Sequence, residues 1–138
     1  MRDTIREYYE AVHEHDWEKL SSTLADDVVR IGILSDIEAD ISRGKEPYLA
    51  FVAKVIGSFD YHTMEIIEIF YSPDRQWACA ETAETIQPPA SERLTLHCLK
   101  IHQLNEAGFI TSINQFRKVS TAAVPTSISV SAVMGARS

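Results

Sequence analysis

The sequence predicts an α+β fold built as a single domain. Two helical segments, a strand and a third helix are followed by four strands without helices between them. Strands grouped in this way are typical of α+β folds, whereas α/β folds alternate the two element types. The length of 138 residues, with 45% hydrophobic and 24% charged residues, suits one globular domain with its own core.

Each helix is predicted from apolar spacing and from a residue that favours a helix start. Asp3 is the expected cap of the first helix and Asp16 of the second, which should end at Asp26-Asp27. The third should begin near Gly44, because Pro47 is tolerated in a first turn, and end at Gly57. The residues expected on the apolar faces are Ile5, Tyr8, Tyr9 and Val12, then Trp17, Leu20 and Leu24, then Tyr48, Phe51, Val52, Val55 and Ile56.

The strands are predicted from β-branched and aromatic content between turn signals. A first strand precedes an acidic, irregular segment at 35–43, which reads as a loop. In that loop, Asp36, Glu38 and Asp40 either form a lid that offers a carboxylate or are simply solvated. The expected strands are 28–34, 62–71, one ending near Ile86, 93–104 and 109–119.

The register of the first hairpin can be argued from its side chains. A turn at 87–90 pairs Glu84 with Arg93 and Thr82 with Thr95, and both pairs are favoured across an antiparallel ladder. The same register places the two cysteines opposite each other. One face should then carry Cys79, Glu81, Ala83, Leu94, Leu96, Cys98 and Lys100.

A second hairpin, turning at 105–108, extends this face onto the last strand. Its register places Ile113 opposite Lys100, Gln115 opposite Cys98, and Arg117 opposite Leu96. An apolar sheet face with a few isolated polar groups is typical of a ligand pocket.

Charge and composition exclude several classes of function. The net charge of −7 disfavours nucleic acid and anionic membrane surfaces as partners. We expect no transmembrane segment, no secretory signal and a cytoplasmic location. The spacing of His, Cys, Asp and Glu predicts no metal site, and without a phosphate-binding glycine loop we expect no cofactor.

Five short motifs resemble the SnoaL-like branch of the nuclear transport factor 2 superfamily over about residues 3–119. They are Tyr8-Tyr9, Asp16-Trp17, 24–28, 43–46 and 108–110. The resemblance implies a curved antiparallel sheet wrapped as a cone around three N-terminal helices, the cystatin-like α+β barrel. It also implies an apolar pocket inside the cone and a homodimer formed through the sheet backs.

The family's enzymes include ketosteroid isomerases, polyketide cyclases and limonene epoxide hydrolases, and their catalytic residues are only partly present. Tyr8 stands where the isomerase has its hydrogen-bonding tyrosine, but Gly32 and Lys100 stand where it has two aspartates. The last two strands contain no aspartate, so the hydrolase set is absent too. The nearest inward carboxylate in the predicted register is Glu81.

The resulting candidate site leaves alternatives open. Glu81 is either a general base or one half of an ion pair with Arg117 or Lys100. Arg117, Tyr8 or Lys100 would stabilise negative charge on a substrate oxygen, although Tyr8 also suits a core position. The expected substrate-binding residues are Arg30, Phe51, Val55, Leu96, Cys98, Ile113 and Gln115. His13, His15 and His102 are expected to be solvated.

The sequence therefore predicts a small cofactor-independent enzyme in the domain 1–119. It would isomerise, cyclise, hydrate or dehydrate an apolar oxygenated molecule such as a polyketide or terpenoid. The alternative is a non-catalytic small-molecule-binding or assembly module on the same fold. The tail 120–138 has one charged residue and is either an interface arm or disordered.

Overall fold

The computed structural model describes residues 2–119 and has the α+β fold that the sequence predicts. The expectation for the tail 120–138 lies outside the described residues. The elements are α1 (Thr4–Glu14), α2 (Trp17–Ser21), β1 (Leu24–Ile31), the short 3-10 helix η1 (Ile37–Ala39), β2 (Ile41–Arg43), α3 (Lys45–Gly57), β3 (Tyr61–Tyr71), β4 (Trp77–Gln87), β5 (Leu94–Leu104) and β6 (Ile110–Arg117).

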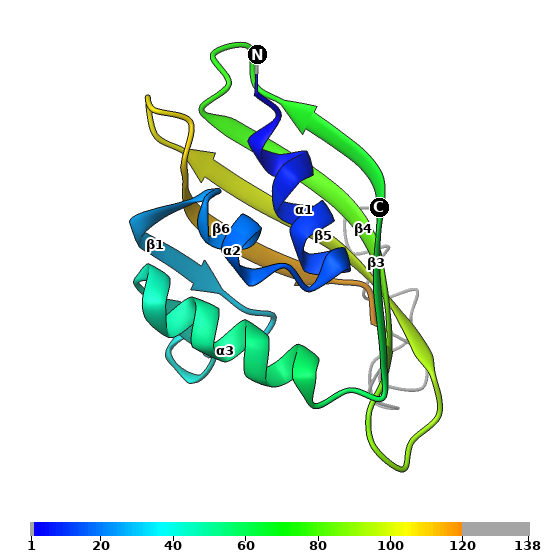
Figure 1. The fold of residues 1–138 in the computed structure, drawn as a ribbon. Helices are drawn as coiled ribbons and strands as arrows, with labels where there is room; N and C mark the ends of the chain where they lie inside the picture. The colour runs from blue at the N-terminus through cyan, green and yellow to red at the C-terminus, as the bar shows by residue number, and fades with distance from the viewer. Residues whose placement is uncertain (1, 120–138) are drawn as a thin grey trace.

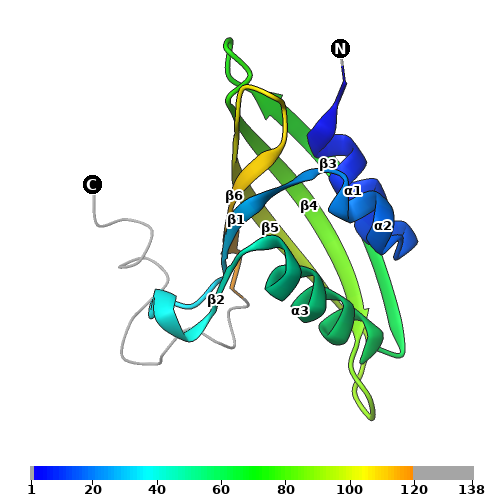
Figure 2. The ribbon, with the colours of Figure 1, turned by 60° about the vertical axis from the view of Figure 1, so that its left-hand side comes forward.

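One curved six-stranded sheet carries the fold, in the order β2-β1-β6-β5-β4-β3. Figures 1 and 2 show the three α-helices together on its concave side. The pairing is antiparallel as expected, except that β1 runs parallel to β6. Within residues 2–119, no helix is long and apolar enough to cross a membrane.

The helix starts agree with the sequence analysis. The Asp3 carboxylate accepts a hydrogen bond from the backbone N–H of Arg6 at 3.2 Å, and that of Asp16 accepts from Lys19 at 3.0 Å. These caps satisfy backbone N–H groups that a helix start leaves without partners. The predicted apolar face of α1 is buried throughout.

Two boundaries near β1 were predicted wrongly. The second helix ends at Ser21, and Leu24, Asp26 and Asp27 belong to the strand β1. The predicted loop at 35–43 contains η1 and the strand β2. Both errors arise because β1 and β2 are fixed by pairing with each other and with β6, which local sequence does not reveal.

The predicted register of the first hairpin is also wrong. Thr95 pairs with Thr85, with 3.0 Å between their hydroxyl oxygens, and Cys98 pairs with Thr82. The loop is longer than predicted, spanning 88–93, and this moves β4 three residues along β5. An odd shift exchanges the two faces of a strand. Glu84 therefore faces inward, and Glu81 faces outward opposite Leu99.

The second hairpin differs from its prediction by two residues, and its faces are preserved. Arg117 pairs with Cys98, Gln115 with Lys100, and Ile113 with His102. An even shift leaves each side chain on its expected side. Arg117, Gln115 and Lys100 consequently remain on the concave face of the sheet, as the sequence indicated.

Candidate functional site

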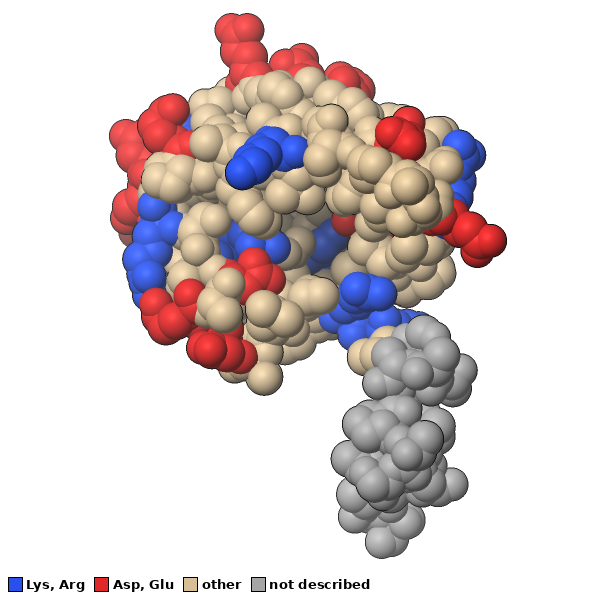
Figure 3. Space-filling view, turned by 90° about the horizontal axis from the view of Figure 1, so that it is seen from below, with Lys and Arg blue, Asp and Glu red and all other residues tan. Residues whose placement is uncertain are grey.

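A cavity of about 280 Å³ lies between α1, α3 and the concave face of the sheet. Figure 3 views the molecule from below and shows a hollow with basic side chains in and beside it. Apolar side chains from α3 and the sheet form much of its wall. The polar residues that line it, apart from Tyr9, are Tyr8, Arg30, Asp40, Tyr48, Glu84, Lys100, Gln115 and Arg117.

The structure brings most of the predicted site residues to this cavity. Those in its wall are Tyr8, Arg30, Phe51, Val55, Leu96, Cys98, Lys100, Gln115 and Arg117. Ile113 does not line the cavity, because it is only 1% exposed and packs in the hydrophobic core.

Glu81 is the predicted catalytic residue that the structure places outside the cavity. It lies on the convex face of the sheet in a shallow groove with His97, Leu99 and Phe116. Neither Arg117 nor Lys100 forms an ion pair with Glu81 in the part of the chain that the structure describes. The prediction of Glu81 as an inward carboxylate is wrong because of the three-residue register error in β4.

Besides Asp40, the cavity wall contains the carboxylate of Glu84, and two histidines connect Glu84 to the surface. Glu84 Oε2 accepts a hydrogen bond from His62 Nε2 at 2.7 Å. The His62 side chain is 1% exposed, and its Nδ1 lies 2.9 Å from Nε2 of His15. His15 is exposed, as the sequence indicated, and caps the C-terminus of α1 with its backbone in the left-handed conformation. The three side chains form a hydrogen-bonded chain from the cavity to solvent.

Sequence reasoning missed this chain because its members come from separate elements. His62 lies on β3 and is paired with Ile86, so its contact with Glu84 depends on the register between β3 and β4. The one available signal was the cross-strand Thr–Thr pair. Choosing Thr85 instead of Thr82 as the partner of Thr95 would have turned Glu84 inward.

Two buried tyrosines supply a hydrogen-bond donor to the same cavity. The hydroxyls of Tyr8 on α1 and Tyr48 on α3 are hydrogen-bonded to each other. Burial raises the pKa of Tyr48 to about 12 and that of Tyr8 further, so both are neutral at physiological pH. Two hydroxyls carry two hydrogens, and their mutual bond uses one. The other hydrogen makes no bond to any side chain within residues 2–119 and is free for a ligand oxygen.

Arg30 is held in the wall by contacts on three sides. Its guanidinium donates to Asp40 Oδ1 at 2.6 Å and to Gln115 Oε1 at 2.9 Å, and it lies 4.5 Å from the Phe51 ring centroid. Arg30 therefore faces the cavity, as predicted for a substrate-binding residue, and also pairs with the acidic segment through Asp40. Burial raises the pKa of the two tyrosine hydroxyls, and the positive charge of Arg30 opposes this in part.

Gly32 makes room for the carboxylate that pairs with Arg30. The Gly32 N–H donates to the backbone oxygen of Asp40 at 2.8 Å, and a Cβ at position 32 would lie 1.9 Å from Asp40 Oδ2. Position 32 is the one that the family resemblance assigned to a base aspartate. Here the Asp40 carboxylate occupies the same space from the segment before β2. This agrees with the expectation that the acidic segment 35–43 could offer a carboxylate to the site.

Two further titratable groups lie buried on β5. The Lys100 amine donates to Thr82 Oγ1 at 2.7 Å and is 5.2 Å from the Tyr9 ring centroid. His102 is hydrogen-bonded to the Tyr9 hydroxyl and has no exposed surface, so the expectation that it is solvated is wrong. Burial and, to a smaller extent, the charge of Lys100 lower the pKa of His102 to about 3. His102 is therefore neutral in the folded protein.

The site thus combines a carboxylate, a neutral hydroxyl donor and a fixed guanidinium around one partly apolar cavity. Such groups are suited to moving a proton and stabilising charge on oxygen, because fixed dipoles act strongly where water is excluded. No group of three or more His, Cys, Asp or Glu side chains within residues 2–119 could hold a metal ion.

Comparison with known proteins agrees with this fold. The family model of the SnoaL-like domain matches residues 5–113. The chain belongs to the SnoaL-like domain family. A search of curated proteins found no sequence match.

Several solved structures share the fold at low sequence identity. SalBIII, an epoxide hydrolase/cyclase-like enzyme with a role in pyran ring formation in the polyether salinomycin, superposes with a TM-score of 0.72. It is 15% identical, and the match covers 85% of this chain and 89% of SalBIII. Rv0760c from Mycobacterium tuberculosis, in complex with estradiol-17beta-hemisuccinate, also gives 0.72 at 20% identity, covering 84% and 92%.

A protein of unknown function with a cystatin-like fold from Methylobium petroleophilum gives a TM-score of 0.72 at 16% identity, covering 89% of this chain and 78% of that one. These likenesses confirm the cystatin-like fold. Among such distant relatives are a cyclase-like enzyme and a protein of unknown function, so the fold by itself does not assign a reaction.

The contact between Gly32 and Asp40 predicts that alanine destabilises the fold at position 32 and does not do so at position 57. G32A should lower the free energy of unfolding by about 1–3 kcal/mol, because the added methyl group displaces the Asp40 carboxylate from Arg30. G57A is the matched control, since a Cβ there meets nothing within 4 Å, and it should be neutral or stabilising by up to about 1 kcal/mol. Urea unfolding measures both. In a D40A background the G32A penalty should vanish, and its persistence there would contradict this contact.

His102 predicts how stability depends on pH. The pKa of His102 is about 3 in the folded protein, below its ordinary 6.5. Between pH 6.5 and 3, the unfolded chain therefore binds a proton at this residue that the folded chain does not bind. The free energy of unfolding should therefore fall by up to about 1.4 kcal/mol per pH unit as pH drops between these values. H102Q should reduce the slope of the unfolding free energy against pH by the equivalent of up to one proton, as measured by urea unfolding at several pH values. An unchanged slope would show that His102 is not buried in its neutral form.

Proposed function

We propose that the protein is a cofactor-independent acid/base enzyme. It isomerises, cyclises, hydrates or dehydrates an apolar, oxygen-bearing small molecule such as a polyketide or terpenoid. The observation that carries the proposal is the carboxylate of Glu84 in the wall of a partly apolar cavity that also contains a free hydroxyl donor.

Glu84 is the proposed general base. Oε2 is held by His62, while Oε1 makes no hydrogen bond to any described side chain and is available to a ligand. It would take a proton from a carbon beside a carbonyl group, or from a water molecule that attacks the ligand. His62 fixes the orientation of the carboxylate, and His15 continues the hydrogen-bonded chain to solvent. This chain gives the proton a route out of an occupied cavity.

The tyrosine pair and Arg30 are the proposed oxygen-binding groups. Negative charge that develops on a ligand oxygen would be stabilised by the free hydroxyl hydrogen and by the nearby guanidinium. Asp40 and Gln115 hold the guanidinium in place before a ligand arrives, so little reorganisation is needed. Glu84 and Tyr48 both line the cavity, which supports assigning the base and the donor to one site.

The cavity wall supports an apolar ligand. Phe51, Val55 and Leu96 contribute to it, and a volume of about 280 Å³ is near the lower limit for small-molecule sites. SalBIII is an epoxide hydrolase/cyclase-like enzyme, and Rv0760c was solved with a steroid derivative. Both names fit an apolar, oxygenated ligand for this chain as well.

A non-catalytic binding module is the second candidate. Its support is that Arg30 and Glu84 already have partners in the cavity, Asp40 and His62 respectively. Paired charges can serve structure alone. Such a module would bind apolar ligands without any turnover that depends on Glu84.

The proposed base can be tested with a probe that needs no knowledge of the natural ligand. Nitrobenzisoxazole opens to a coloured phenolate when a base removes its ring C–H proton. We expect the wild-type protein to accelerate this reaction and E84Q to lose about 100-fold or more of the rate. The matched control is E81Q, the same substitution on the convex face of β4, which should retain the wild-type rate.

Equal rates for E84Q and the wild type, or no acceleration by the wild type, would contradict a catalytic Glu84. In either case, retained binding of an apolar fluorescent dye in the cavity would favour the binding module. Far-ultraviolet circular dichroism of each variant shows whether the fold is intact.

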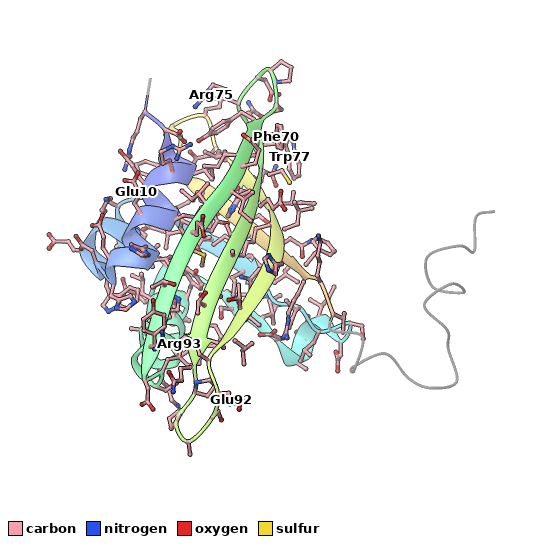
Figure 4. All side chains as sticks on the ribbon, turned by 90° about the vertical axis from the view of Figure 1, so that its right-hand side faces the viewer. Glu10, Phe70, Arg75, Trp77, Glu92 and Arg93 are labelled. Atoms are coloured by element: carbon pink, nitrogen blue, oxygen red, sulfur yellow. The ribbon has the colours of Figure 1, made fainter. Side chains whose placement is uncertain are left out.

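We further propose that the protein forms a homodimer through the convex face of the sheet, as the family resemblance implies. Large apolar side chains on the sheet are exposed there, including Leu99 at 42% and Phe116 at 50%. Phe70 and Trp77 lie near each other at one end of β3 and β4 (Figure 4). Burying such side chains is favourable, and monomers rarely expose many of them together.

Sedimentation equilibrium tests the dimer. The wild type should sediment at twice the 15.5 kDa mass of one chain, and F116D should shift it to the monomer, because a buried carboxylate without a partner opposes association. A monomeric wild type at micromolar concentration would contradict this interface.

A further inference from the structure

Lys100 is a buried amine in the wall of the cavity. It lies on β5 between Ala80 of β4 and Gln115 of β6, and Tyr9 of α1 covers it. The residue is only 2% exposed, although the cavity reaches it. A lysine that is hidden from bulk solvent and still borders a ligand cavity is unusual, because lysine side chains are almost never fully buried unless paired.

The amine has no carboxylate partner. No Asp or Glu oxygen within residues 2–119 lies within 4.0 Å of Nζ, and its hydrogen-bond acceptor is Thr82 Oγ1 at 2.7 Å. The titratable groups around it are Glu84 on β4, Cys98 and His102 on β5, and Tyr9 on α1.

An ammonium group is poorly accommodated in these surroundings. It carries three hydrogens, and one of them has an acceptor among the described residues. Burial lowers the pKa of the Lys100 amine, and the charge of Glu84 opposes this only in part. A larger share of Lys100 is consequently the neutral amine, which has a lone pair for attack on carbon.

We propose that Lys100 is a nucleophile that forms an imine with the aldehyde or ketone group of a ligand in the cavity. This inference rests on the proposed function and narrows its substrate class from oxygenated molecules to carbonyl compounds. The proposal also gives a role to Lys100, which stands where the isomerase pattern has an aspartate.

The proposed step conserves atoms and electrons. The Nζ lone pair attacks the carbonyl carbon, and one amine proton moves to the oxygen to give a carbinolamine. A proton delivered from solvent along the chain His15, His62 and Glu84 then allows the hydroxyl to leave as water, and a protonated C=N bond replaces the C=O bond. Nothing is oxidised or reduced. The protonated imine acidifies the neighbouring C–H, whose proton the Glu84 carboxylate can take, and hydrolysis returns the amine.

Reductive trapping tests the imine directly. The wild-type protein is incubated at neutral pH with hexanal and sodium cyanoborohydride, which reduces an imine to a stable secondary amine, and modified lysines are located by peptide mass mapping. We expect Lys100 to be modified at least about ten times faster than Lys54, an exposed lysine on α3. K100M, which keeps an unbranched side chain but lacks the amine, should lose the fast adduct and retain slow modification of Lys54.

Modification of Lys100 no faster than Lys54, or none at all, would overturn the inference. Mapping the wild-type protein alone decides this, so the test does not depend on whether K100M folds. The nitrobenzisoxazole reaction needs a base and no amine, so the two failures are distinguishable. Fast trapping at Lys100 without Glu84-dependent activity would reject the proposed base, and Glu84-dependent activity without trapping would reject only the imine.

Discussion

The hydrogen bond between Glu84 and His62 is the constraint on which the candidate site depends. A carboxylate in a partly apolar cavity wall loses much of its hydration, and a hydrogen-bond donor must replace the lost water. His62 provides that partner from the neighbouring strand β3, with 2.7 Å between Nε2 and Oε2. Because His62 is itself buried, its other nitrogen also needs a partner, and His15 at the end of α1 supplies it. The carboxylate of Glu84 thereby links β4 to His62 on β3 and, through His15, to the end of α1.

The other polar groups of the cavity follow the same arrangement: each is hydrogen-bonded to a neighbouring side chain and also borders the cavity. Asp40 and Gln115 hold Arg30, the two tyrosine hydroxyls hold each other, and Thr82 holds Lys100. Such contacts reduce the cost of ordering these side chains when a ligand binds. They also explain the absence of a side chain at Gly32, since Asp40 occupies that space. This arrangement would suit the proposed ligand, which has both an apolar body and a polar oxygen.

The helix starts were predictable because their signals are local. The caps Asp3 and Asp16 and the apolar stripe of α1 could all be read without knowing the fold. The concave faces of β5 and β6 were also predictable, because an error of two residues does not change which side a residue faces. The face of β4 was not, because the loop at 88–93 was longer than assumed and the error was odd. The roles of Glu84 and His62 escaped prediction for one reason: each acquires its role from a partner on another element.

The most direct test of the account is the state of the His62 imidazole. Long-range ¹H–¹⁵N NMR spectra should show a hydrogen on Nε2 of His62 that exchanges slowly with solvent, because it is buried and hydrogen-bonded to Glu84. E84A should abolish this slowly exchanging signal, whereas E81A, on the other face of the same strand, should leave it unchanged. A signal that survives E84A, or one that disappears in E81A, would contradict the inward position of Glu84 and with it the site built around that residue.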